Sequence, residues 1–116
     1  MKSLEEIKNI LNAHKEELRR RYKVKELGIF GSYVRSKQKE GSDIDILAEF
    51  ENEMELGGFE YIGLMTDLED YLRETLNIKP HLASKKHAMA SDKWELIKNE
   101  VVYVFVETKN ANKIEI

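Results

Sequence analysis

Apolar residues recur every three or four positions near the start of the chain, which is typical of a helix that buries one face. The apolar positions of this run are Leu4, Ile7, Ile10, Leu11 and Leu18. Ser3 and Glu6 stand at its start, where each side chain can bind the other residue's backbone amide. We therefore predict an amphipathic helix over residues 4–21, which ends in Arg19–Arg21 at the negative end of the helix dipole.

Apolar and polar residues alternate in two later segments, the pattern of a β-strand with one buried face. We predict a strand over residues 24–30 and a break at Gly31 and Ser32, with Ser32 capping a short helix through about residue 36. A polar loop then leads to a second strand over residues 43–50. On that strand the residues expected to share one face are Ile44, Ile46, Ala48 and Phe50, and those on the other are Asp43, Asp45, Leu47 and Glu49.

The middle of the chain predicts a long helix followed by a short strand. An acidic loop over residues 51–58 precedes apolar residues at helical spacing, which predict a helix over 59–76 that ends at Asn77. Residues 78–83 suit a strand, and Pro80 restricts it to a sheet edge or to the start of a strand.

The last part of the chain predicts one more helix. We interpret residues 85–91 as a polar connection and Asp92 as the cap of a helix that begins at Lys93. Residues 102–106 could continue that helix or form a strand, and the tail after Glu107 is expected to be loose.

The order of these elements predicts one α/β (α+β) domain over residues 1–116, in which helices cover a small mixed sheet. The composition agrees, because 41% of the residues are hydrophobic, enough for one small core, and 35% are charged. The absence of cysteine excludes disulfides and thiolate zinc sites and suits a reducing compartment, so we expect a cytoplasmic protein. The apolar runs are too short to cross a membrane. A net charge of −3 disfavours general coating of nucleic acid, although a local RNA contact through Arg19–Arg21 stays open.

Two carboxylates mark the second predicted strand as a candidate for chemistry. Asp43 and Asp45 would point the same way, with Cα atoms about 6.5–7 Å apart. Like charges on one face of a strand repel each other, and aspartate is a poor strand former. A hard divalent cation would offset this cost, because Mg²⁺ binds one or two carboxylates together with phosphate and water oxygens. The alternative is a solvated strand edge in a chain with 22 acidic residues.

A second candidate feature lies at the end of the first strand. Gly31 lets the backbone approach a ligand closely, and the following turn offers backbone N–H groups and the Ser32 hydroxyl to an anion. Arg35, about one turn later, can supply a bidentate positive contact. Residues 31–35 would thus bind phosphates beside a metal held at Asp43 and Asp45, which suits a nucleoside triphosphate with Mg²⁺. No Walker sequence is present, so this is not a P-loop site.

Gly31-Ser32, ten intervening residues and Asp43-Ile44-Asp45 resemble the signature of the DNA polymerase β-like nucleotidyltransferase superfamily. The wider stretch over residues 29–50 is similar to the minimal nucleotidyltransferase family, small prokaryotic proteins often paired as antitoxins with HEPN-domain toxins. The resemblance implies the polymerase β-like fold, triphosphate binding by Gly31, Ser32 and Arg35, and two catalytic Mg²⁺ ions at Asp43 and Asp45.

The chain departs from this pattern at the position of a third carboxylate. The family has an aspartate on the next strand, in a pattern similar to Lys-Val-Asp-Leu, where this chain has Lys79-Pro80-His81-Leu82. Imidazole is a poor Mg²⁺ ligand, so the second ion would be weakened. His81 is therefore either a lost ligand or a general base, since an unperturbed histidine titrates near pH 6.5.

The resemblance implies transfer of AMP from ATP to a hydroxyl, typically a tyrosine of the HEPN toxin, in an antitoxin. The second hypothesis is a binding module that neutralises its partner by association alone, which His81 favours. A third hypothesis is transfer to a small molecule, as in aminoglycoside nucleotidyltransferases. Those enzymes have an added substrate domain, and here a second copy of the chain would have to take its place.

Overall fold

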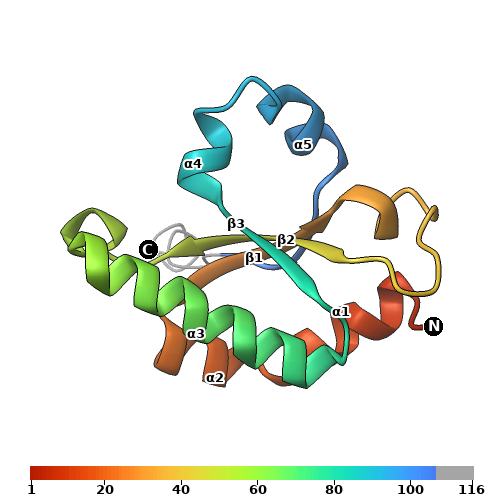
Figure 1. Ribbon diagram of the computed structural model, residues 1–116, viewed down its shortest axis with the longest axis horizontal. Coiled ribbons are helices and arrows are strands. Elements are labelled where there is room, and N and C mark those ends of the chain that lie inside the picture. Colours follow the sequence, from red (N-terminus) through yellow and green to blue (C-terminus); the bar gives the residue numbers. More distant parts are fainter. Residues whose placement is uncertain (107–116) are drawn as a thin grey trace, which may run out of the picture.

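The computed structural model describes residues 1–106, in which helices pack on a mixed β-sheet (Figure 1). The helices are α1 Leu4–Ala13, α2 Lys15–Tyr22, α3 Gly58–Leu76, α4 Lys85–Met89 and α5 Trp94–Glu100. The strands are β1 Val24–Phe30, β2 Ile44–Phe50, β3 Pro80–Ser84 and β4 Val102–Phe105. Their order across the sheet is β3-β2-β1-β4; β1 runs antiparallel to β2 and β4, and β2 runs parallel to β3. The predicted fold class, a small mixed sheet covered by helices, is confirmed.

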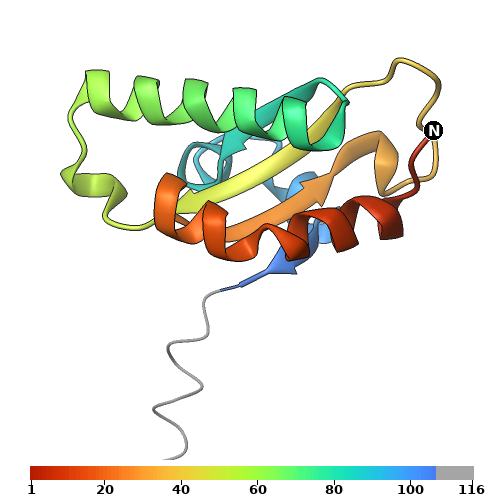
Figure 2. The same ribbon diagram turned by 90° about the horizontal axis from the view of Figure 1, so that it is seen from below.

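The main core lies between the sheet and helices α1, α2 and α3, which cover one face together (Figure 2). The predicted apolar face of β2 is buried there, as is the apolar face of each helix. Its fully buried members include Ile7, Leu11, Leu18, Ile29, Ile44, Ile46, Leu68, Leu72 and Leu76. Burying a side chain of this size contributes about 1.5–3 kcal/mol, so this layer holds the sheet in place.

The opposite face of the sheet carries the segment that contains α4 and α5 (Figure 1). Leu47 is 1% exposed on this face of β2. A side chain at Gly28 would approach Val101 and Tyr103, so the absence of a side chain there lets the chain around β4 pack against β1. The two faces of β2 thus have different neighbours, an apolar layer and a largely polar one.

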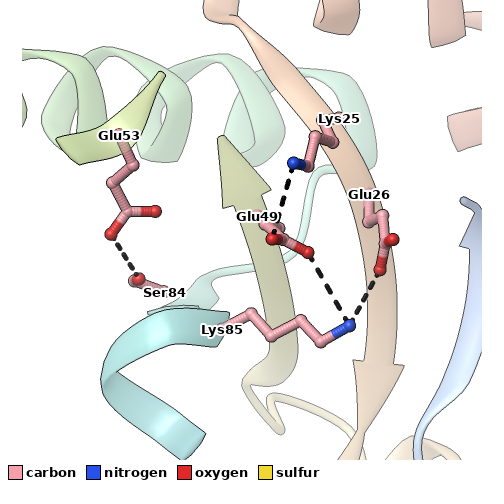
Figure 3. A network of polar contacts seen from close by, with 6 residues as sticks. All are labelled: Lys25, Glu26, Glu49, Glu53, Ser84 and Lys85. Atoms are coloured by element: carbon pink, nitrogen blue, oxygen red, sulfur yellow. Dashed lines mark hydrogen bonds and ion pairs between the residues drawn. The ribbon is translucent and has the colours of Figure 1, made fainter. Parts of the chain in front are cut away.

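A charged cluster, which we call the lysine cluster, joins α4 to the sheet on this second face (Figure 3). Lys85 Nζ lies 2.9 Å from Glu26 Oε1 and 3.7 Å from Glu49 Oε1. Lys25 Nζ lies 3.7 Å from the other oxygen of Glu49. Burial by itself would lower the pKa of Lys85, but hydrogen bonds to Glu26 and Tyr103 and the nearby charges raise it above its ordinary value. Within the cluster Lys85 therefore stays protonated, and its positive charge balances the negative charge of Glu26 and Glu49.

The first predicted helix is wrong in one respect, because it breaks at His14 into α1 and α2. In a continuous helix the backbone N–H of His14 would bind the carbonyl of Ile10. The His14 ring nitrogen Nδ1 instead donates to that carbonyl at 2.8 Å, and the backbone N–H binds Leu11 O. Side-chain competition of this kind is not visible in the spacing of apolar residues. The capping pair Ser3 and Glu6 is present as predicted.

Other boundaries differ from the predictions in ways that have local causes. Ser32 does not cap a helix: the turn is a short 3₁₀ helix, Gly31–Tyr33, which begins two residues before the predicted start, at Gly31 with its φ of +80°. The predicted polar connection over 85–91 contains α4, whose cap is the Ser84 side chain. Asp92 does not cap α5, which begins after Lys93 with no side-chain cap.

Pro80 begins β3, which is an edge strand as predicted. The open alternative for residues 102–106 is resolved as a strand, β4. The predicted loose tail after Glu107 lies outside the described residues. Among residues 1–106, no helix combines the length and the apolar character that crossing a membrane requires.

Candidate nucleotide-binding site

The predicted glycine–serine turn meets Asp45, one of the two predicted aspartates, where β1 ends and β2 begins. Phe30, the last residue of β1, pairs with Asp45 near the start of β2. The chain then turns at Gly31, and a Cβ placed there would lie 2.9 Å from Asp45 Cγ and even closer to its carboxylate oxygen. No side chain fits in this space, and the φ of +80° also favours glycine. The turn and the Asp45 carboxylate are therefore packed directly against each other.

The parallel pairing of β2 with β3 places His81 beside Asp45. His81 Nδ1 lies 3.1 Å from Asp45 Oδ1. The His81 side chain is 76% exposed and that of Asp45 is 26% exposed, so the imidazole forms the outer wall of the site. The structure thus puts His81 on the neighbouring strand at the level of the aspartate.

Asp43 lies just before β2 and is exposed. The backbone N–H of Ile44, the next residue, donates to Lys79 O at 3.0 Å and fixes the start of the strand against the segment that leads into β3. Within residues 1–106 the structure records no lysine or arginine ion pair with Asp43 or Asp45. Of the two carboxylates, Asp45 thus has its recorded ring contact from His81, and neither has a lysine or arginine partner among the described residues.

Arg35 and Gly31 are joined by a residue that sequence reasoning missed, Glu100. The backbone N–H of Gly31 donates to Glu100 Oε2 at 2.8 Å. Arg35 Nη1 donates to Glu100 Oε1, also at 2.8 Å. One glutamate among 22 acidic residues carries no signal by itself. The only feature that marks it in the sequence is its place directly before the apolar run that becomes β4.

Ser32 is half-buried within the 3₁₀ turn, and its carbonyl accepts a hydrogen bond from the Lys37 N–H at 2.9 Å. The arginines 19–21, the candidate contact for RNA, end α2 instead of facing this site. Arg20 and Arg21 pair with Glu17 at 3.8 and 3.0 Å. These pairs reduce the net positive charge of the helix end, and an RNA contact there stays a prediction.

The donor set can be tested against the ion that the sequence suggests. No group of three or more histidine, aspartate or glutamate side chains arranged to hold a metal occurs in the described part of the chain. Asp43 and Asp45 would supply two carboxylates to such an ion. This fits Mg²⁺ carried by a nucleotide, because phosphate and water oxygens then complete its coordination.

Comparison with protein families now identifies the chain. Residues 11–111 match the model of the nucleotidyltransferase domain family. This chain is a member of that family. The match contains the glycine–serine turn, the aspartate pair and His81. The nucleotidyltransferase shares 45% identity over 104 residues with the protein adenylyltransferase MntA of Thermococcus cleftensis, covering 90% of this chain and 98% of the relative.

Solved structures support the same fold for this nucleotidyltransferase. One is a toxin-antitoxin crystal structure with AMP-PNP, at a TM-score of 0.57 and 18% identity, covering 89% of this chain and 78% of that one. Another is a tri-AMPylated Shewanella oneidensis HEPN toxin in complex with an MNT antitoxin, at a TM-score of 0.55 and 15% identity, covering 90% of this chain and 77% of that one. At such identities the likeness concerns the fold alone.

Proposed function

We propose that this nucleotidyltransferase is a Mg²⁺-dependent protein adenylyltransferase that transfers AMP from ATP to a hydroxyl, most simply a tyrosine, of a HEPN-type toxin, and so acts as an antitoxin. The observation that carries the proposal is the packing of the Asp45 carboxylate against the Gly31 turn. It brings a candidate cation ligand to the place where backbone donors would bind phosphates. The identity with a relative named protein adenylyltransferase MntA supports the choice of acceptor.

Each predicted residue then has one role. Asp43 and Asp45 would hold Mg²⁺, which when bound neutralises phosphate charge and polarises the phosphoryl oxygens. The Ser32 hydroxyl, the amides of the turn that follow Gly31 and the Arg35 guanidinium would bind and orient the triphosphate, while the Gly31 N–H stays bound to Glu100. The acceptor hydroxyl oxygen attacks the α-phosphorus of ATP and forms a new P–O bond, while its O–H bond breaks and the proton passes to a base, in the simplest case water. The bond between the α-phosphorus and the oxygen that bridges it to the β-phosphorus breaks, and pyrophosphate leaves. The chain's contribution is positioning and charge, worth more because the turn is held in place before the nucleotide arrives.

The exposure of the site suits an acceptor that belongs to a partner. Asp43, just before β2, is exposed, and the His81 side chain on the edge strand β3 is 76% exposed. A partner protein could therefore bring its own hydroxyl to the aspartates and supply the other wall of the site. A structural neighbour that contains a tri-AMPylated HEPN toxin is consistent with such an acceptor.

The proposal is tested by incubating the chain with α-labelled ATP, Mg²⁺ and a purified HEPN-domain protein as the candidate acceptor. We expect label on the HEPN protein with wild type and none with the variant in which Asp43 and Asp45 are both asparagine. Mass spectrometry of the labelled peptide then identifies the acceptor hydroxyl. Label that appears equally with the double variant would contradict the proposal.

The second candidate is a binding module that neutralises the toxin by association alone, and His81 is the observation that favours it. Beside Asp45, the imidazole stands where a carboxylate would strengthen a second metal ion. A stable but unlabelled complex with the HEPN protein would support this candidate. His81→Asp refines the test: transfer should rise if His81 is a lost ligand, and fall if it accepts the proton of the attacking hydroxyl.

A further inference from the structure

The carboxylate of Glu100 joins the glycine–serine turn to Arg35, the two features that we assign to phosphate binding. It accepts one hydrogen bond from the Gly31 N–H and one from Arg35 Nη1, each 2.8 Å long and each to a different oxygen. Glu100 is the last residue of α5 and lies 69 and 65 residues from these partners along the chain. The contact therefore ties the far end of the domain to the glycine–serine turn.

We propose that Glu100 is a positioning residue for nucleotide binding: it fixes the Gly31 turn and orients the Arg35 guanidinium toward the triphosphate. The inference rests on the proposed function, because it concerns how well ATP is received. Arginine loses several rotatable bonds of freedom when it binds a phosphate. A guanidinium that is already held by a carboxylate loses less, so binding is strengthened by preorganisation.

The opposite reading is that Glu100 imitates a phosphate and must leave before ATP enters. The fold argues against this reading. Glu100 lies two residues before Val102, the first residue of β4. In this strand Val102 pairs with Ile29 of β1 and Tyr103 pairs with Gly28. Its side chain is only 13% exposed. Withdrawal would require a new rotamer for this largely buried side chain and would leave the Gly31 N–H without its acceptor, so we treat the carboxylate as a fixed part of the site.

The geometry also leaves room for a ligand on the arginine. Glu100 engages Nη1, whereas a guanidinium carries five N–H donors. The Arg35 side chain is 47% exposed, so part of the guanidinium faces solvent. One edge is thus held by the protein while another is presented outward. A phosphate could bind the outward edge without displacing Glu100.

The test is a double-mutant cycle on the full chain, with Glu100→Gln, Arg35→Gln and the double variant. Glutamine keeps the size of glutamate, but its amide nitrogen is a donor and cannot accept from Arg35 or Gly31. We expect Glu100→Gln to weaken Mg·ATP binding roughly tenfold in calorimetry, the effect of one charge-assisted hydrogen bond. AMP, which lacks the β- and γ-phosphates, should bind within about twofold of its wild-type affinity.

The cycle separates positioning from general support of the fold. In the Arg35→Gln background, Glu100→Gln should have little further effect on ATP affinity, because its action passes mainly through Arg35. The matched control is Glu95→Gln on the same helix, where the exposed Glu95 pairs only locally with Lys98 at 3.0 Å; it should bind ATP as wild type does. If Glu100→Gln does not remain folded by circular dichroism, Glu100→Asp, which keeps the charge and shortens the reach, takes its place in the cycle.

Tighter ATP binding by Glu100→Gln would overturn the proposal in favour of a competing carboxylate. Equal losses for ATP and AMP, equal losses in both backgrounds, or no loss at all would overturn it as well. A wild-type chain that does not bind Mg·ATP would overturn the proposed function and this inference with it. A chain that binds ATP but fails the cycle would overturn the inference alone.

Discussion

Two carboxylates on one strand, Asp45 and Glu49, have opposite surroundings. They lie on the same face of β2, about 13 Å apart by strand geometry. Glu49 stands between Lys25 and Lys85, with both ion-pair distances at 3.7 Å. Asp45 contacts the Gly31 turn and His81, and within residues 1–106 no lysine or arginine ion pair to it is recorded. Glu49 is thus paired with two lysines, whereas the recorded contacts of Asp45 are with the Gly31 turn and with His81.

The difference shows that lysines accompany the carboxylates at one end of the strand, while among the described residues the carboxylates at the other end have none. Glu49 pairs across the strands with Glu26, and two like charges in that position repel each other. Lys85 contacts both glutamates and relieves this repulsion. At the other end of the strand, Asp43 and Asp45 repel each other without a lysine between them. A bound cation would relieve this repulsion, as Lys85 does for Glu26 and Glu49 in the lysine cluster.

The largest expected effect comes from replacing a carboxylate by an amide at each end of β2, at Asp45 and at Glu49. Asp45→Asn should reduce adenylyl transfer by roughly a thousandfold or more, because a cation ligand beside the phosphates is lost. Its melting temperature should stay at or above that of wild type, since repulsion with Asp43 is relieved. Glu49→Gln is the matched control: it should transfer AMP within about twofold of wild type but unfold more easily.

Rates from the labelled-ATP assay and thermal melts of both variants check this comparison. A transfer rate of Asp45→Asn within about tenfold of wild type would remove the functional role assigned to that end of the strand. A thermal stability of Glu49→Gln equal to that of wild type would remove the structural role of the other.

Gly31→Ala should have the next largest effect, because position 31 combines two constraints. Its φ of +80° strains any other residue, and the new Cβ would collide with the Asp45 carboxylate. We expect a loss of about 1–3 kcal/mol in stability and a drop in transfer of roughly a hundredfold as Asp45 is displaced. Gly41→Ala is the control, because Gly41 has a φ of +83° but no atom within 4 Å of its added Cβ.

Denaturant unfolding and the transfer assay separate the two constraints. Gly41→Ala should lose about 1 kcal/mol of stability from backbone strain and keep its activity. An active Gly31→Ala with the same small loss as Gly41→Ala would mean that the contact with Asp45 is unimportant.

A smaller effect is expected from removing the central charge of the lysine cluster. Lys85→Met keeps the length of the side chain but leaves Glu26 and Glu49 facing each other, and the Lys85 side chain is only 20% exposed. The free energy of unfolding should fall by about 1–3 kcal/mol, with transfer largely unchanged. Lys98→Met, at an exposed pair with Glu95, should change stability by less than about 0.5 kcal/mol. Equal effects of the two substitutions in urea unfolding would contradict the structural role of the lysine cluster.

Local sequence patterns predict most helices and strands of the fold, and they predict the Gly31 turn and the aspartates of the candidate site. The spacing of Leu68, Leu72 and Leu76 predicts a buried helix face wherever that helix packs, and the alternation along residues 44–50 predicts which side of β2 is apolar. The Gly31 turn and the aspartates could be joined in advance because a known motif spans them in one short stretch. Their roles in binding and catalysis stay predictions.

The rest depended on contacts between distant segments, which sequence spacing does not contain. Glu100 reaches Gly31 and Arg35 only because β4 pairs with β1, and residues 102–106 suited a helix as well as a strand. The break at His14 depends on one side-chain hydrogen bond to Ile10. Lys85 belongs to a stretch that we interpreted as a polar connection. It is the first residue of α4 and forms the ion pair with Glu26 in the lysine cluster.

The smallest expected effect is a loss of stability at high pH that depends on Lys85. Its pKa in the folded state is raised above 10.5, the ordinary lysine value, so the folded chain keeps this proton longer than the unfolded chain does. The stabilisation is therefore complete below about pH 10.5 and is lost as the pH rises through the folded pKa. Burial also raises the pKa of Tyr33 and Tyr71 from an ordinary value of 10.0, which lowers stability in the same range.

Urea midpoints of wild type and Lys85→Met, measured from pH 8 to pH 12, isolate the lysine, because both tyrosines are present in each. The difference between the two curves should shrink above about pH 10.5, and a difference that stays constant would show that Lys85 acts by packing instead of by charge.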